Sequence, residues 1–239
     1  MYSMNCRIRY SETDRDGRLS MNGLLRLFQD VGYSHATDRN LGMDYTKRTR
    51  CTWYLLSWHI CSMDMPAAGE QVTVSTYIYD CQASLAYKSI ELKSTDGRLL
   101  AVGDTKWVHM NIDRQEPEDA ALGQWPDTDF GDKAEMPKAS RRIEVPKAMT
   151  PAEKSYVKPY LIDTNGHANN VRLTELAMSI SGADAGCEIL RAEFKRQVSR
   201  DTFVYPYIAD KENGVVTVFK DEKGEVLSVF EFIYKGDRL

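Results

Sequence analysis

Two stretches of the sequence, 149 positions apart, follow one plan. Residues 163–176 read Asp163-Thr-Asn-Gly-His-Ala-Asn-Asn-Val-Arg-Leu-Thr-Glu-Leu176, and residues 14–27 read Asp14-Arg-Asp-Gly-Arg-Leu-Ser-Met-Asn-Gly-Leu-Leu-Arg-Leu27. Four of the fourteen positions are identical, and each stretch passes from polar turn residues into apolar residues at helical spacing. The plan predicts a turn that leads into a helix in each half, and therefore two copies of one fold in tandem.

The elements around the two stretches also repeat. A short strand is expected before each turn (6–10 and 155–160), then a helix (about 20–40 and 170–182), then a series of strands. Those strands are expected at 52–63, 72–79, 86–92 and 99–110 in the first half, and at 189–198, 203–209, 215–219 and 226–234 in the second. Because helices and strands do not alternate, the sequence predicts an α+β fold, with a curved antiparallel sheet wrapped around one long helix in each half.

Residues 114–153 separate the two copies and carry five of the eight prolines, with little periodicity. We therefore expect three parts: an N-terminal unit at 1–113, a proline-rich linker at 114–153 and a C-terminal unit at 154–239. One unit alone leaves a sheet edge unpaired, which explains why two copies are fused. Oligomeric state is left open, with a homodimer among the outcomes.

Composition excludes several classes of protein. The 239 residues are 42% hydrophobic and 28% charged, as in a soluble globular protein, and the net charge of −4 disfavours a nucleic-acid partner. No apolar run approaches the roughly 18 residues of a membrane span, so no integral membrane segment is expected. The five cysteines form no CxxC pair and no signal-peptide core is evident, which favours the reducing cytoplasm. The four histidines are scattered, so neither a metal site nor a cofactor is expected.

Residues 163–170 bring together the side chains for chemistry. His167 has the imidazole that suits a general base near neutral pH, and Asn169 or Asn170 can cap the helix that follows. Backbone amides at that helix N-terminus are then expected to face a developing oxyanion. The first copy keeps the turn residues but has Arg18 at the position of His167, so turn geometry does not require the histidine. A merely polar turn with an asparagine cap remains the alternative.

The chain resembles the acyl-acyl-carrier-protein thioesterases of the plant and bacterial type, which are tandem hotdog proteins. Asp163–Val171 is similar to that family's Asp-x-Asn-x-His-x-Asn-Asn-Val signature. The segments 28–30, 107–111 and 193–201 resemble other family segments in matching order. The resemblance implies a double hotdog fold and hydrolysis of fatty acyl-carrier protein to a free fatty acid.

The resemblance also implies a catalytic site at Asp163, Asn165 and His167. Gln197 stands where family members usually have a catalytic glutamate, and Val198 where they often have a cysteine. We include Gln197 in the candidate catalytic set, although an amide can orient a water molecule but cannot take its proton. Asn169 and Asn170 are expected to bind the substrate through nearby backbone amides.

Two further groups of residues are predicted to contact the substrate. The acyl chain needs an apolar slot, for which we nominate the bulky residues Phe28, Trp53, Trp58 and Trp107. A basic face would steer an acidic carrier protein, and the candidates are Arg141, Arg142, Lys195, Arg196 and Arg200. Hydrolysis of acyl-coenzyme A is the first alternative function, and acyl binding without catalysis, favoured by Gln197, is the second. A hotdog dehydratase fits the asparagine-rich motif less well.

Overall fold

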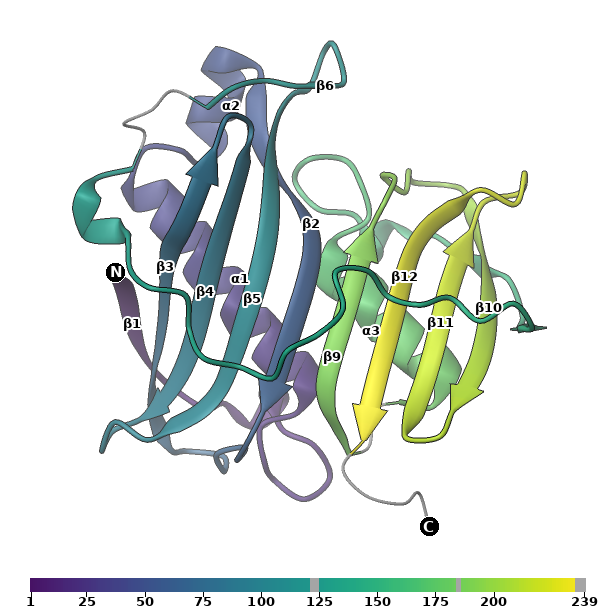
Figure 1. Cartoon of the computed structure of the whole chain (residues 1–239), viewed down its shortest axis with the longest axis horizontal. Helices are drawn as coiled ribbons and strands as arrows, with labels where there is room; N and C mark the ends of the chain where they lie inside the picture. The colour runs from purple at the N-terminus through teal and green to yellow at the C-terminus, as the bar shows by residue number, and fades with distance from the viewer. Residues whose placement is uncertain (121–124, 184–185, 235–239) are drawn as a thin grey trace. The chain divides into compact units, whose positions relative to one another are not determined.

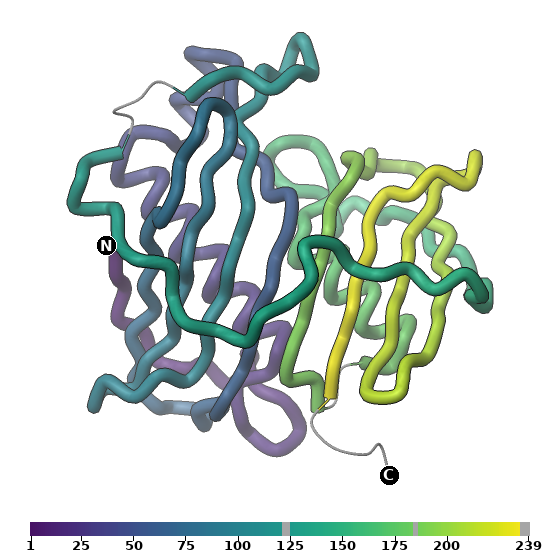
Figure 2. Tube along the Cα trace, viewed as in Figure 1, coloured from purple at the N-terminus to yellow at the C-terminus, as the bar shows by residue number. Residues whose placement is uncertain are grey.

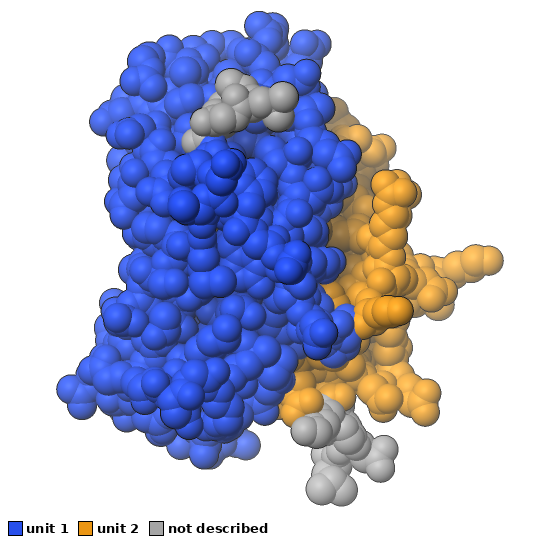
Figure 3. All heavy atoms as spheres, turned by 60° about the vertical axis from the view of Figure 1, so that its left-hand side comes forward, with its two compact units in different colours: residues 1–56, 60–137 blue, residues 57–59, 138–239 orange. Residues whose placement is uncertain are grey.

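The computed structural model describes residues 1–120, 125–183 and 186–234. The chain forms two compact units, residues 1–56 with 60–137 and residues 57–59 with 138–239, which Figure 3 shows in separate colours. No helix among the described residues is both long and apolar enough to cross a membrane.

The first unit is a five-stranded antiparallel sheet with a long helix on one face (Figure 1). Its elements are β1 (Tyr2–Arg7), the 3-10 turn η1 (Tyr10–Glu12), α1 (Met21–Asp38), α2 (Met43–Thr49), β2 (Cys51–Ser62), β3 (Gln71–Gln82), β4 (Leu85–Ser94), β5 (Leu99–Asn111) and β6 (Glu116–Pro117). The strands are ordered β1-β3-β4-β5-β2, and β6 pairs with β5. A second 3-10 turn, η2 (Asp127–Asp129), follows.

Helix α1 forms where the sequence predicts it and buries one face. The Ser20 side chain accepts a hydrogen bond from the Gly23 amide at 3.0 Å and so caps the helix. Leu24, Leu25 and Val31 are fully buried, as is Phe28, in the core against the sheet. Such burial contributes roughly 1.5–3 kcal/mol for each large apolar side chain, which makes this face the main anchor of the helix.

The second unit repeats the plan. Its elements are β7 (Thr150–Pro151), β8 (Ser155–Tyr156), the 3-10 turn η3 (Pro159–Leu161), α3 (Asn170–Ser181), β9 (Cys187–Phe194), β10 (Phe203–Lys211), β11 (Gly214–Lys220) and β12 (Val226–Tyr234). Strand order is β9-β12-β11-β10-β7, with β8 also paired to β10. Figure 2 traces the same succession in each unit, a helix followed by an antiparallel meander.

The described part of the proline-rich segment is packed against the two sheets; we call residues 125–149 the strap. In the first unit the Gly131 amide donates to Ile78 O at 2.9 Å and the Ala134 amide to the Ser89 hydroxyl at 3.1 Å. In the second unit Ile143 is buried with Val216, Val218 and Val229. Figure 1 shows the strap (teal) crossing the face of β3, β4 and β5 opposite α1.

The expected elements are largely confirmed, with several differences; the strand expected at 189–198, for example, ends at Phe194 as β9. Strand β12 matches its predicted range, and α1 and α3 lie where the apolar spacing placed them. The strand expected at 6–10 begins earlier, as β1, and gives way to η1; likewise 155–160 divides into β8 and η3. Helix α2 was not predicted, because none of its residues is buried and its sequence carries no apolar face.

Candidate functional site

The turn at residues 163–168 is closed by its own backbone. The Asp163 amide donates to His167 O at 2.9 Å, and the Gly166 amide donates to Asp163 O at 3.1 Å. Gly166 has a φ of 80°, a left-handed conformation that glycine adopts without strain. The Asn165 amide donates to Asp163 Oδ1 at 2.7 Å, so one carboxylate oxygen of Asp163 holds the turn.

Neighbouring segments fix this turn on both sides. The Asn169 amide donates to Leu161 O in η3 at 2.8 Å, and the Ala168 amide donates to Val198 O at 2.8 Å. His167 and Ser199 form an isolated antiparallel bridge. The turn is therefore held between η3 and the connection from β9 to β10, which brings the Gln197 segment alongside the motif.

His167 is half-buried, and one of its ring nitrogens is buried without a partner among the described residues. Its Nδ1 atom has no hydrogen-bond partner in the part of the chain that the structure describes. The Asp163 carboxylate therefore does not hold that nitrogen. A neutral imidazole accepts a hydrogen bond at one nitrogen and donates from the other, so this nitrogen keeps an unused hydrogen-bonding capacity within the described chain.

The first turn of α3 offers fewer free amides than the sequence predicts. The Asn169 side chain accepts hydrogen bonds from the Val171 amide at 3.0 Å and the Arg172 amide at 3.3 Å. The Asn169 amide itself is bonded to Leu161 O. Among the described residues, Asn170 has the one amide of this turn with no bonded acceptor. The cap and η3 engage the other amides of this turn, and the role of Asn169 and Asn170 in substrate binding stays a prediction.

The first copy contains the same turn. The Asp14 amide donates to Arg18 O at 2.8 Å, and the Asp16 amide donates to Asp14 Oδ1 at 2.9 Å. The Leu19 amide donates to Pro66 O at 2.8 Å, as the Ala168 amide does to Val198 O in the second copy. The predicted repeat is thus confirmed at the level of single hydrogen bonds.

The two copies differ in the side chain that the turn presents. Arg18 Nη1 donates to Met65 O at 2.5 Å and lies 3.5 Å from Asp64 Oδ1, so its guanidinium ties the turn to the segment after β2. At the equivalent position His167 Nδ1 has no partner within the described parts of the chain. The same backbone therefore carries a structural side-chain contact in one copy and a ring nitrogen without such a contact in the other.

Gln197 lies in an exposed position directly before Val198. By the matching hydrogen bonds of the two copies, its counterpart in the first unit is Met65. The structure therefore brings the Gln197 backbone beside the motif, whereas its catalytic role stays a prediction.

The five predicted basic residues divide into two groups. Lys195 pairs with Glu193 at 2.8 Å, Arg196 with Glu225 at 2.9 Å and Arg200 with Asp201 at 3.0 Å. Arg141 and Arg142 instead lie in the strap, exposed, next to the buried Ile143. Their predicted role with a carrier protein remains a prediction, and the ion pairs reduce the positive potential that the first group offers.

The four predicted acyl-contact residues lie at different places in the fold. Phe28 is 2% exposed and Trp58 is 6% exposed. The Trp53 ring lies 5.1 Å from the His109 ring, and its buried Nε1 has no partner among the described residues. Trp107 Nε1 donates to the Thr105 hydroxyl at 2.8 Å. Their contact with an acyl chain stays a prediction.

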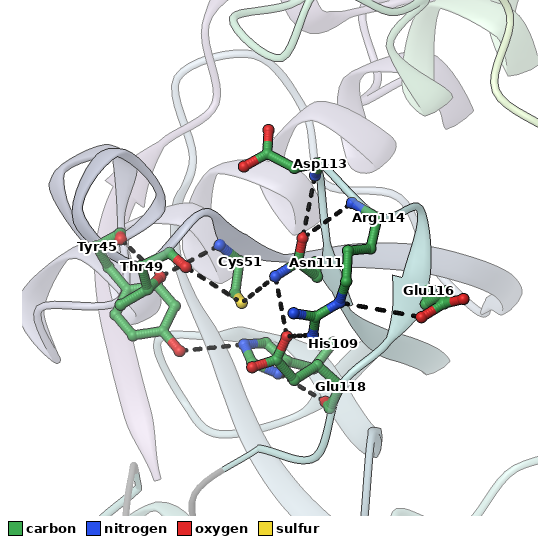
Figure 4. A network of polar contacts seen from close by, with 9 residues as sticks. All are labelled: Tyr45, Thr49, Cys51, His109, Asn111, Asp113, Arg114, Glu116 and Glu118. Carbon is green, nitrogen blue, oxygen red and sulfur yellow. Dashed lines mark hydrogen bonds and ion pairs between the residues drawn. The ribbon is translucent and has the colours of Figure 1, made fainter.

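A second polar cluster, in the first unit, is closed on itself (Figure 4). His109 Nδ1 donates to Glu118 O at 2.8 Å and Nε2 lies 3.1 Å from the Tyr45 hydroxyl, so both ring nitrogens are engaged. Asn111 Nδ2 donates to Glu118 Oε2 at 3.0 Å and approaches Cys51 Sγ at 3.9 Å. This cluster joins α2 to β5 and the β6 hairpin.

The cysteines are poorly suited to act as nucleophiles. Burial raises the pKa of every one of the five thiols, to about 11 for Cys61 and to about 12 for Cys187. These thiols remain protonated near neutral pH, and the thiolate is the nucleophilic form. No group of His, Cys, Asp and Glu within residues 1–120, 125–183 and 186–234 could hold a metal ion.

Arg172 is a residue of this site that the motif comparison does not include. Its guanidinium donates to Ile162 O at 3.1 Å and also to Tyr160 O. The sequence feature that could have drawn attention to Arg172 is its position in the first turn of a helix. A cation is unfavourable there, next to the positive end of the helix dipole.

Comparisons with known proteins agree with this arrangement. The family model of the acyl-ACP thioesterase N-terminal domain matches residues 1–121. The fold is similar to that of an acyl-ACP thioesterase from Bacteroides thetaiotaomicron (TM-score 0.81, 19% identity, 98% of this chain and 97% of that one). It is also similar to that of 12:0-ACP thioesterase from Umbellularia californica (TM-score 0.79, 15% identity, 98% of this chain and 96% of that one). No curated protein sequence matches the chain.

These findings confirm the predicted α+β hotdog fold class. The family model covers more than half of the chain and the two copies share the turn described above. The chain therefore belongs to the acyl-acyl-carrier-protein thioesterase family, a family of thiolester hydrolases.

Proposed function

We propose that this chain hydrolyses the thioester of a fatty acyl-acyl-carrier protein at the 163–170 turn and releases the free fatty acid. The observation that carries the proposal is the contrast between the copies. One backbone turn occurs twice, and only the second presents an imidazole with a buried, unpartnered nitrogen among the described residues. That imidazole precedes a helix whose first amide, on Asn170, has no acceptor in the described chain.

The proposed reaction uses few groups. The Asn170 amide and the Asn165 side chain polarise the thioester carbonyl, and His167 removes a proton from the attacking water. The water oxygen bonds to the carbonyl carbon and the C–S bond breaks. The proton held by His167 passes to the departing sulfur, which leaves as a thiol. No cofactor is required by this route.

Two roles are considered for Asp163, one in the structure of the turn and one in the chemistry. Because Asp163 Oδ1 accepts the Asn165 amide, the carboxylate shapes the turn. Alternatively it attacks the thioester and forms a short-lived anhydride. Asparagine can still accept that amide, so we expect Asp163→Asn to retain more activity than Asp163→Ala. Equal losses, together with 18O transfer from water into Asp163 in a single turnover, would support the anhydride instead.

A panel of thioesters tests whether the acyl chain is carried by acyl-carrier protein or by coenzyme A. Acyl-carrier proteins and acyl-coenzyme A molecules of varied chain length are assayed for free thiol. We expect carrier-protein substrates to give the higher kcat/KM and the steeper decrease with salt. Preference for coenzyme A would favour the first alternative function, and binding of acyl-carrier protein without thiol release would favour the acyl-binding alternative. Cytoplasmic location and a homodimer remain predictions.

A further inference from the structure

We infer that Arg172 is a positioning residue for hydrolysis at the 163–170 turn, an inference that rests on the proposed function. Its guanidinium binds the carbonyl oxygens of Tyr160 and Ile162, the residues on either side of Leu161. Leu161 O in turn accepts the Asn169 amide. The arginine therefore joins the first turn of α3 to the segment from which the motif begins.

The placement of this arginine runs against helix electrostatics. Arg172 is the third residue of α3, and no acidic residue occupies that first turn. A cation near a helix N-terminus is unfavourable, because the helix dipole places partial positive charge there. The two carbonyl contacts, both made by Nη1, offset that cost.

The first copy handles the same position differently. Position 172 corresponds to Gly23, where an added Cβ would overlap Glu12 O. The Ser20 amide and hydroxyl both donate to that oxygen, each at 2.9 Å. In the first unit α1 therefore lies directly on η1. In the second unit the long side chain of Arg172 connects α3 to η3. The bridging guanidinium occurs in the copy that carries His167.

The bridge acts on groups at both ends of the motif. Ile162 precedes Asp163 and forms an isolated bridge with Ala168, next to His167. The Asn169 amide bond to Leu161 O sets the approach to Asn170. Displacement of reacting groups by about 1 Å can lower a rate about 100-fold, so loss of the bridge should reduce turnover more than substrate binding.

The test compares Arg172→Met, Arg172→Lys and Arg172→Ala with the control Lys223→Met, an exposed cation in the turn before β12. We expect kcat of the first two variants to fall about 10- to 100-fold while KM stays within about twofold. Lysine keeps the charge but places a compact, strongly hydrated ammonium on a shorter side chain where Nη1 stands, so it should not fully restore kcat. Dilute guanidinium should raise the rate of Arg172→Ala and leave that of His167→Ala unchanged.

Hydrogen exchange gives a readout that does not depend on activity. The amides of Asp163 and Asn169 should exchange faster in Arg172→Met than in Lys223→Met, at equal thermal stability. The inference is overturned if kcat stays within twofold of the parent, if lost folding accounts for the change, or if exchange is unaltered. A parent chain that hydrolyses no thioester would reject the proposed function instead, and exchange would then decide alone whether Arg172 holds the turn.

Discussion

At the scale of single residues, the two copies form an internal control. Arg18 and His167 occupy the same place in the same hydrogen-bonded turn. Arg18 is engaged by Met65 O, whereas His167 Nδ1 is buried without a partner in the described residues. The two turns therefore differ in one side chain and its surroundings, and not in the backbone.

His167→Ala tests the general base directly. The variant should lower kcat about 10²–10⁴-fold, because a positioned acid–base group contributes about that much to proton transfer. The measurement is thiol release under saturating acyl-carrier protein. Thr164→Ala, an exposed change in the same turn, serves as the control and should keep its rate. Hydrolysis by His167→Ala at near the parent rate would remove the histidine from the mechanism.

At the scale of elements, the packing of α1 on β5 depends on a glycine. A Cβ at Gly103 would lie 2.9 Å from Phe28 Cε2 and 3.6 Å from Ile60 Cγ1. Phe28 is 2% exposed, and its ring is packed in a protein interior, where a shift of a large side chain is costly. The close approach of this helix to the sheet therefore requires the absence of a side chain at position 103.

Gly103→Ala should destabilise the protein by about 1–3 kcal/mol through overpacking. Gly32 supplies a matched control, since it lies inside α1 and no atom of the described residues comes within 4 Å of a Cβ built there. Gly32→Ala should raise stability by up to about 1 kcal/mol through helix propensity. Urea unfolding of both variants checks the pair. Equal stability of the two would mean that the sheet moves aside at no cost.

The sequence predicted elements best where a periodic apolar face or a cap was present. Ser20 and Asn169 marked both helix starts, and Gly182 marked the end of α3. Helix α2 was not predicted from the sequence because it buries no residue. The candidate site residues were nominated from their chemistry, and their roles stay predictions. The bonding of the Asn169 amide to Leu161 O was not predicted, since that contact depends on where η3 lies. The two carbonyl contacts of Arg172 were not predicted for the same reason.

At the scale of the whole molecule, the strap is fastened by a buried charged cluster. Asp129 accepts hydrogen bonds from His35 Nε2 at 2.8 Å and from Arg39 Nε at 2.6 Å, and both its carboxylate and His35 are fully buried. Burial and the nearby Lys88 ammonium lower the pKa of His35 to about 4, against the effect of Asp129. The Trp125 ring packs 4.8 Å from the His35 ring and completes the enclosure.

This cluster predicts a pH dependence of stability. His35 is neutral when folded, with a pKa of about 4 against 6.5 in the unfolded chain. The unfolded state therefore binds more protons between these values, and the stabilising contribution is complete above pH 6.5 and lost as the pH falls towards 4.

His35→Gln should flatten the decrease in unfolding free energy over that window, measured by urea titration at a series of pH values. The carboxylate of Asp129 titrates lower: burial raises its pKa, but the hydrogen bonds from Arg39 and His35 outweigh this and lower it to about 2. Loss of its contribution therefore falls below that window. An unchanged slope in His35→Gln would show that other groups take up the protons.

The strap also affects how two molecules of this protein can associate. Its described residues cross the sheet face opposite the helix, at Ile78 and Ser89 in the first unit and at Val216 and Val218 in the second. A second molecule that stacked sheet against sheet would first have to displace a segment held by Ile143 and the Asp129 cluster. Self-association through strand edges, loops or helices leaves that segment in place, so the strap restricts the geometry of assembly to those surfaces.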